Sequence, residues 1–223
     1  MSILYVWIWK NACESMGNMK YIVGVVAVVL LAIIGYYTWQ AYGSGGQAPL
    51  PEPSPEEVVM AKYATSTFSI EYPNTFSVND AYAYEGVPNK PISGVKFTVP
   101  STMTTGTNLA SDSGVSVEWL PRASTCTGDI YVLQNVKAFD MTVGTTTYSV
   151  ATTTEGAAGN IYEELVYAIP GSSPCTAVRY FIHSSNYQNY FPEEGEPAEI
   201  KEFDRAALLK TFDSIRNSLV LTQ

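Results

Sequence analysis

The sequence contains one histidine, His183, so any histidine-based chemistry depends on this residue. A single histidine excludes metal sites built on several histidines and leaves a Ser/His/Asp triad as the remaining histidine-based mechanism. No G-x-S-x-G motif supplies the nucleophile. Ser184 and Ser185 are its neighbours in sequence, but adjacent strand residues point to opposite faces. We therefore expect an ordinary hydrogen-bonded histidine.

The carboxylates offer no clearer catalytic arrangement. Glu163 and Glu164 are adjacent in a predicted strand, so they point to opposite sides and cannot form an acid and base pair. Glu118 is isolated beside Trp119, and we interpret it as a residue of the surface or of the core edge. The acidic stretch 193–204 lacks the spacing of a calcium loop, which indicates a solvated loop. The sequence thus predicts no catalytic residue, no metal site and no cofactor.

Three cysteines occur, at Cys13, Cys126 and Cys175. The last two follow the apolar segment described below, on its predicted oxidising side, where an even pair of cysteines indicates a disulfide. Such a bridge would stabilise the fold by about 4 kcal/mol, because it restricts the unfolded chain. A redox pair and a metal site are the alternatives, but no C-x-x-C motif is present and no second cysteine or histidine lies near either residue.

Because no catalytic motif is present, we predict that the protein functions by binding another molecule. Tyr187 and Tyr190 occur in the segment SSNYQNYF, and with His183 they are the candidate surface binding residues. We predict a non-catalytic binding module for an envelope protein or a glycan. The alternatives are an envelope hydrolase with a dispersed site and an assembly factor for a membrane complex.

Short segments in which apolar and polar residues alternate must position these side chains. They predict strands over the ranges 67–72, 75–78, 95–99, 115–120, 130–133, 145–151, 161–169 and 178–183. Because no long amphipathic helix separates them, we expect a largely antiparallel sheet. The range 56–63 fits either a lead-in helix or linker, and the range 133–140 is ambiguous. A closing helix begins after its N-cap, Asp204. Its apolar stripe consists of Leu208, Phe212, Ile215 and Leu219.

An uncharged apolar segment precedes the domain, and the net charge of the 223-residue chain is −9. The acidic balance argues against nucleic acid as a partner. Residues 21–39 carry aromatic residues at both ends and would rise about 28 Å as a helix, close to the thickness of a bilayer core. Lys10 and Lys20 precede this segment, and no basic residue follows it until Lys62. The positive-inside rule therefore predicts a cytoplasmic N-terminus and a domain on the periplasmic or extracellular side of the cell membrane.

The predicted organisation has four parts: a cytoplasmic stub (1–20), a transmembrane signal anchor (21–39), a Gly/Ser/Pro-rich linker (40–61) and an extracytoplasmic globular domain (62–223). A cleaved signal peptide is the competing interpretation, although the aromatic end of the segment makes a poor cleavage site. Met1, Met16 and Met19 are alternative starts. A type IV pilin is disfavoured, because Gly and Pro break the chain after the helix and no carboxylate lies in the apolar run.

Both ends of the domain carry motifs of a known family. ATSTFSIEYPNTF (64–76) resembles the start of PsbP-like domains, and FDRAALLKTFDSIRNSLVL (203–221) is similar to their end. This resemblance implies the α+β class, with an antiparallel sheet flanked by helices in an α/β/α sandwich. PsbP supports oxygen evolution through contacts on a photosystem, and no matching residues occur here, so only the fold is carried over. Residues 175–219 also resemble a group of uncharacterised bacterial envelope proteins.

Overall fold

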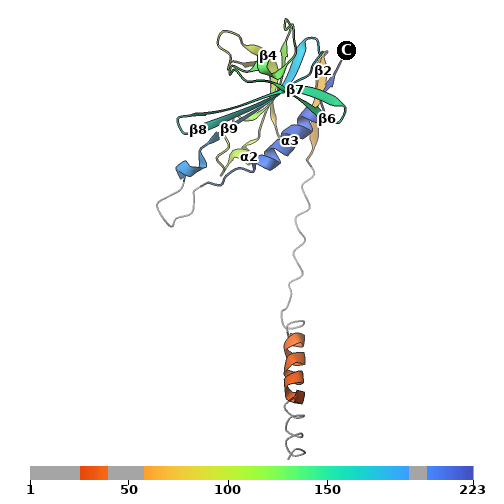
Figure 1. Cartoon of the computed structure of the whole chain (residues 1–223), viewed down its shortest axis with the longest axis vertical. Coiled ribbons are helices and arrows are strands. Elements are labelled where there is room, and N and C mark those ends of the chain that lie inside the picture. Colours follow the sequence, from red (N-terminus) through yellow and green to blue (C-terminus); the bar gives the residue numbers. More distant parts are fainter. Residues whose placement is uncertain (1–25, 40–57, 191–199, 223) are drawn as a thin grey trace, which may run out of the picture. The chain divides into compact units, whose positions relative to one another are not determined.

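The structure, a computed structural model, describes residues 26–39, 58–190 and 200–222 (Figure 1). The chain divides into two compact units, residues 1–56 and 57–223, and each is described by itself. In the first unit, residues 26–39 form a helix with exposed side chains. Within the described ranges, no helix is both long and apolar enough to span a membrane. The predicted stub (1–20), the start of the predicted anchor (21–25) and most of the predicted linker (40–57) lie outside the described residues.

The second unit consists mainly of strands. In chain order they are β1 (Met60–Ala64), β2 (Phe68–Pro73), β3 (Ser77–Tyr84), β4 (Ile92–Thr98), β5 (Gly114–Leu120), β6 (Phe139–Val143), β7 (Thr146–Ala157), β8 (Asn160–Ala168), β9 (Cys175–Ser185) and β10 (Val220–Leu221). Its described helical elements are α2 (Ser101–Thr104), the 3-10 turns η1 (Gly128–Tyr131) and η2 (Tyr187–Tyr190), and α3 (Arg205–Asn217).

These strands form two antiparallel sheets. The larger sheet has the order β3-β4-β5-β9-β8-β7-β6, and the smaller sheet has the order β1-β2-β10. Among the described strands, every neighbouring pair is antiparallel. This arrangement confirms the predicted α+β class with an antiparallel sheet. β10 pairs with β2, which brings the two ends of the domain together in the smaller sheet.

One face of the larger sheet packs against α3 and the smaller sheet, and α3 lies beside β2 in Figure 1. Alternate residues of β9 and one side of α3 form this core: Val178, Tyr180, Ile182, Leu208, Phe212 and Ile215. The predicted N-cap is confirmed, because the Asp204 side chain accepts a hydrogen bond from the Ala207 backbone N–H at 2.9 Å. The helix ends at Asn217, before Leu219, which is still packed against the core.

The opposite face of the larger sheet is covered by residues 121–138, which we call the cover segment. Tyr131 and Val132 from this segment pack against small side chains of β7, β8 and β9, namely Ala151, Val166, Ala168 and Ala177. Only the η1 turn is helical within the cover segment. Among the described residues, the larger sheet therefore has a helix longer than one turn only on the face that packs against α3.

Three predictions about elements were wrong or unresolved. The predicted strand 130–133 overlaps η1 instead, because this segment crosses the face of a sheet whose strands are already paired with one another. Of the range 56–63, the structure describes residues 58–63, and no helix forms there. From Met60 the chain forms β1, whose Tyr63 packs against Phe97 of the core at a centroid distance of 5.9 Å. The ambiguous range 133–140 ends in the edge strand β6.

Candidate functional site

Cys126 and Cys175 form a disulfide bond, as predicted, with their Cα atoms 5.2 Å apart. Cys175 opens β9, whereas Cys126 lies in the cover segment just before η1. The bond therefore attaches the cover segment to the strand beneath it. Close to the bond, the Tyr131 hydroxyl donates to the Cys175 carbonyl oxygen at 2.7 Å, which holds η1 over the same strand.

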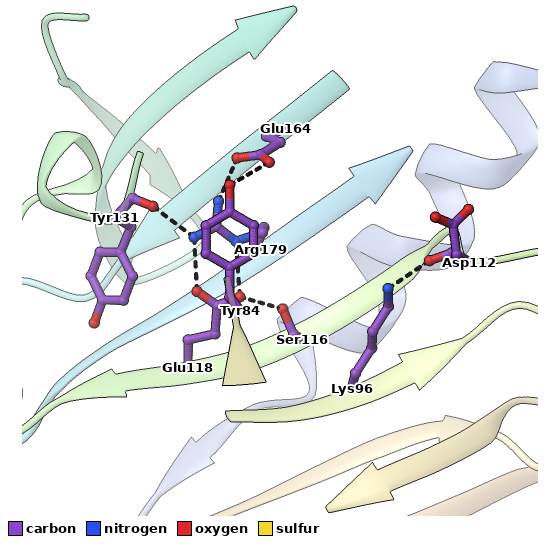
Figure 2. A network of polar contacts seen from close by, with 8 residues as sticks. All are labelled: Tyr84, Lys96, Asp112, Ser116, Glu118, Tyr131, Glu164 and Arg179. Atoms are coloured by element: carbon purple, nitrogen blue, oxygen red, sulfur yellow. Dashed lines mark hydrogen bonds and ion pairs between the residues drawn. The ribbon is translucent and has the colours of Figure 1, made fainter. Parts of the chain in front are cut away.

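Arg179 lies at the centre of a buried polar network beneath the cover segment (Figure 2). Its Nε and Nη2 donate to the two carboxylate oxygens of Glu118 at 2.8 and 2.9 Å, and its Nη1 donates to Glu164 at 2.5 Å. Nη2 also donates to the Tyr131 carbonyl oxygen at 2.7 Å. The guanidinium carbon lies 3.5 Å from the ring centroid of Tyr84, whose hydroxyl donates to Glu164 at 2.6 Å. One cation thus joins β5, β8 and the cover segment.

The strand register explains why these side chains meet. Arg179 of β9 lies opposite Ser116 of β5 and Val166 of β8. Glu118 is two residues after Ser116 and Glu164 is two residues before Val166, so both lie on the same face of the sheet as Arg179. Diagonal neighbours on one face are about 7–8 Å apart, which long side chains can bridge.

Burial determines the charge states of the network. The side chains of Arg179 and Glu118 are 0% exposed, and that of Glu164 is 13% exposed. Burial opposes the charge of Arg179, but the neighbouring Glu118 and Glu164 hold its pKa above the usual value. Burial also raises the pKa of Tyr82 and of Tyr84, so both phenols stay neutral well into the alkaline range. One guanidinium against two carboxylates leaves the network with an excess negative charge.

Tyr84 and Glu164 belong both to this network and to the wall of a pocket of about 490 Å³, which we call the sheet pocket. Four aromatic residues line it: Tyr82, Tyr84, Tyr162 and Phe181. Its charged and amide-bearing residues are Glu85, Lys96, Asp112, Gln134, Glu155 and Glu164. The size and the mixture of ring faces with a few polar groups are typical of a small-ligand site.

Lys96 brings an ammonium group into the sheet pocket from β4. Its Nζ donates to the Asp112 carbonyl oxygen at 2.6 Å (Figure 2). The same atom lies 4.9 Å from the ring centroid of Phe181 and 5.5 Å from that of Tyr82, within the range of cation–π attraction. Burial lowers the pKa of Lys96, an effect that Asp112 and Glu118 oppose. A carbonyl oxygen and two aromatic rings thus surround this ammonium.

Carboxylates lie across the pocket from β4, on β7 and β8. In the register, Phe181 of β9 is opposite Glu164 of β8, and Tyr162 of β8 is opposite Glu155 of β7. Each of these two rings therefore has a carboxylate as its directly opposite neighbour. The Gln134 side chain, from the cover segment, donates to Glu155 at the pocket wall. The cover segment thus helps to shape the site.

His183 lies beside the sheet pocket rather than in its wall. Its Nδ1 is 2.8 Å from Asp112 Oδ1, and its ring stacks on Tyr162 at a centroid distance of 4.4 Å. It is hydrogen-bonded, as expected from the sequence. A catalytic triad would require a serine hydroxyl at Nε2, whereas this atom is buried without a hydrogen-bond partner among the described residues. His183 therefore positions Asp112 and Tyr162, both of which line the pocket.

Tyr187 and Tyr190, the other two predicted binding residues, form part of η2 after the end of β9. Both side chains are partly buried, and neither lines the sheet pocket. The structure does not bring these two tyrosines together with His183 in one cavity.

The residues that make the site were not predicted from the sequence. Glu118 was interpreted as a residue of the surface or core edge, and this was wrong, because it is fully buried on Arg179. The prediction that Glu163 and Glu164 point to opposite sides is confirmed: Glu163 pairs with Arg205 of α3 at 2.6 Å, and Glu164 pairs with Arg179. The available signal was a charged residue inside the apolar run TAVRYFIHS, because a buried charge requires a partner.

Together these features define an antiparallel α+β domain with a disulfide-attached cover segment, a buried arginine network and an aromatic pocket with carboxylates in its wall. Among the residues that the structure describes, no group of three or more His, Cys, Asp or Glu side chains is arranged to hold a metal ion.

Comparison with known proteins gives little further information. No family model matches this chain, and no curated protein is significantly similar to it. A crystal structure of a protein from Bacteroides thetaiotaomicron is similar, with 12% sequence identity and a TM-score of 0.39. The match covers 70% of this chain and 45% of that chain, so this chain spans less than half of the matched protein.

Proposed function

We propose that this protein is a non-catalytic binding module and that the sheet pocket binds a glycan. The observation that carries the proposal is the combination of four aromatic rings with carboxylate, amide and ammonium groups around one pocket. Ring faces pack against the apolar faces of sugar rings. Carboxylates accept hydrogen bonds from sugar hydroxyls, ammonium groups donate to them, and an amide does both. A flat protein partner would use less of such a concave site.

The state of the carboxylates supports binding rather than hydrolysis. A glycosidase needs one carboxylic acid and one carboxylate that are free to act on the substrate. Glu118 and Glu164 are both bound to Arg179, and Glu164 also accepts from Tyr84. A hydrolase that used these two carboxylates would therefore have to break this network. No contact of the described residues favours an assembly factor over a binding module.

Binding in the sheet pocket is expected to depend on Tyr162. Tyr162→Ala should weaken the binding of an oligosaccharide by about tenfold, because it removes a ring face from the pocket wall. The measurement is titration calorimetry of the full chain in mild detergent against a panel of bacterial envelope oligosaccharides. Tyr187→Ala is the matched control, because Tyr187 lies in η2 outside the pocket lining. The reverse result, with Tyr187 needed and Tyr162 dispensable, would place the binding surface at η2.

We further propose that residues 21–39 anchor the chain in the cell membrane and that the domain lies on the periplasmic or extracellular side. The flanking lysines and the disulfide support this topology, because disulfides persist in oxidising compartments. Protease added to intact cells that express the full chain is expected to digest residues 57–223. Complete protection of this unit, with digestion only after cell lysis, would argue for a cytoplasmic domain.

A relationship to PsbP-like domains is also a proposal. It is supported by the two motif segments, because FSIEYP forms β2, and the closing motif forms α3 and β10, which packs beside β2. The α/β/α sandwich of that family has helices on both faces of the sheet. It would therefore require a helical layer on the face opposite α3, where the cover segment lies here.

A further inference from the structure

We propose that the ligand of the sheet pocket carries a protonated amine, so that the glycan bound there is an amino sugar with a free ammonium group. This inference rests on the proposed function, because it names the ligand class of the same pocket. Three features carry it: the charge of the pocket, the way in which its rings already hold an ammonium, and the position of one carboxylate.

The charge of the pocket favours a cation. Four carboxylates line it, from Glu85, Asp112, Glu155 and Glu164, against the single ammonium of Lys96. Arg179 and Glu118 beneath the pocket contribute one charge of each sign. The pocket therefore has a net charge of −3 with all groups ionised. This negative charge attracts a cation and repels a carboxylate or phosphate ligand.

The aromatic rings are placed to accept an ammonium. The domain's own Lys96 shows this, because its Nζ lies over Phe181 and Tyr82 at 4.9 and 5.5 Å. An ammonium over a ring face is attracted by the negative charge of that face, more strongly when the ammonium is desolvated. Lys96 lies over Tyr82 and Phe181, and Arg179 lies over Tyr84, so Tyr162 is the remaining ring of the pocket. Its direct neighbour on β7 is a carboxylate that Arg179 does not bind. A ligand ring stacked at Tyr162 would therefore bring its substituents close to that carboxylate.

Glu155 is this carboxylate, directly opposite Tyr162 in the register. Glu164 already accepts hydrogen bonds from Arg179 and Tyr84, whereas the partner of Glu155 is the neutral amide of Gln134. A charged donor makes a stronger hydrogen bond to a carboxylate than a neutral amide does. A ligand ammonium can thus displace the amide of Gln134 from Glu155, with Tyr162 against the sugar ring.

The test compares probes that differ only in this amine. Glucosamine tetramer, N-acetylglucosamine tetramer and the neutral glucose tetramer cellotetraose are titrated into the full chain in mild detergent at pH 7. The glucosamine tetramer is expected to bind about tenfold more tightly than either of the other two. Equal or tighter binding of the acetylated tetramer would overturn the inference but leave the proposed function intact. If none of the three tetramers binds, the inference is overturned, and the panel of envelope oligosaccharides decides the proposed function.

Two controls assign the effect to the pocket and to the sugar. Glu155→Gln removes one charge with little change in shape. It should weaken binding of the glucosamine tetramer by about three- to tenfold, and binding of cellotetraose by clearly less. Asp140→Asn removes the same charge from the exposed edge strand β6 and should change neither. A similar loss in both variants would attribute the effect to net charge alone. A tetralysine peptide that binds as tightly as the amino sugar would overturn the assignment to a glycan.

Discussion

Replacing Arg179 with methionine is expected to lower the free energy of unfolding of the domain by about 3–5 kcal/mol, which is the usual cost of removing one partner from a buried ion pair. Methionine fills much of the space but donates no hydrogen bond. Glu118, fully buried, would then keep the Ser116 hydroxyl at 2.7 Å as its one hydrogen-bond partner among the described residues. Glu164 would keep the hydroxyl of Tyr84. The measurement is denaturant unfolding of the full chain in mild detergent, followed by near-ultraviolet circular dichroism.

The matched control for this substitution is Arg205→Met, which also removes an arginine paired with a glutamate on β8. Arg205 and its partner Glu163 are 48% and 18% exposed, so the loss should be about 0–1 kcal/mol. If both variants lost the same amount, the Arg179 network would not be a buried structural centre. Combining Arg179→Met with Glu118→Leu should recover part of the loss, because no unpaired charge then remains at Glu118.

The second large effect is expected from removing the disulfide. The Cys126→Ala/Cys175→Ala double variant should lose about 4 kcal/mol of unfolding free energy, since the unfolded chain is no longer restricted by the bridge. The variant should also bind ligand more weakly, because the bond attaches the cover segment that places Gln134 at the pocket. Denaturant unfolding measures the first effect, and titration calorimetry with the oligosaccharide that binds wild type measures the second.

Cys13→Ala is the control for the double variant. Cys13 lies outside the unit 57–223, so its replacement should change neither the stability of the domain nor its ligand binding. Loss of stability with unchanged affinity would mean that the cover segment keeps its place on the sheet without the bond. Unchanged stability would contradict the structural role of the disulfide itself.

Local sequence patterns predicted most of the elements. Alternation over 67–72 and 178–183 corresponds to β2 and β9, and the four-three-four spacing from Leu208 to Leu219 corresponds to α3 and its buried stripe. These patterns succeed because each reports which side of one element is buried. The disulfide was predictable for a different reason, since only one pairing is available to the two cysteines of the domain.

The prediction failed where a segment's environment, rather than its own pattern, determines its conformation. Residues 130–133 are apolar enough for a strand, but they cross the face of a sheet whose strands already pair with one another. No strand edge is therefore available to them at this place, and η1 forms instead. Met60 to Ala64 carry no clear signal of their own, yet they form β1 because β2 offers a free edge and Tyr63 reaches the core.

The sequence by itself determined the class of fold, the closing helix, the cysteine pair and the opposite directions of Glu163 and Glu164. It did not determine the partners of Arg179, because Glu118 and Glu164 are 61 and 15 residues away from it in the chain. It did not determine the sheet pocket either, whose wall comes from several strands and the cover segment. Only the order and register of the strands decided these contacts, since neighbours across a sheet are fixed by backbone pairing and not by distance along the chain.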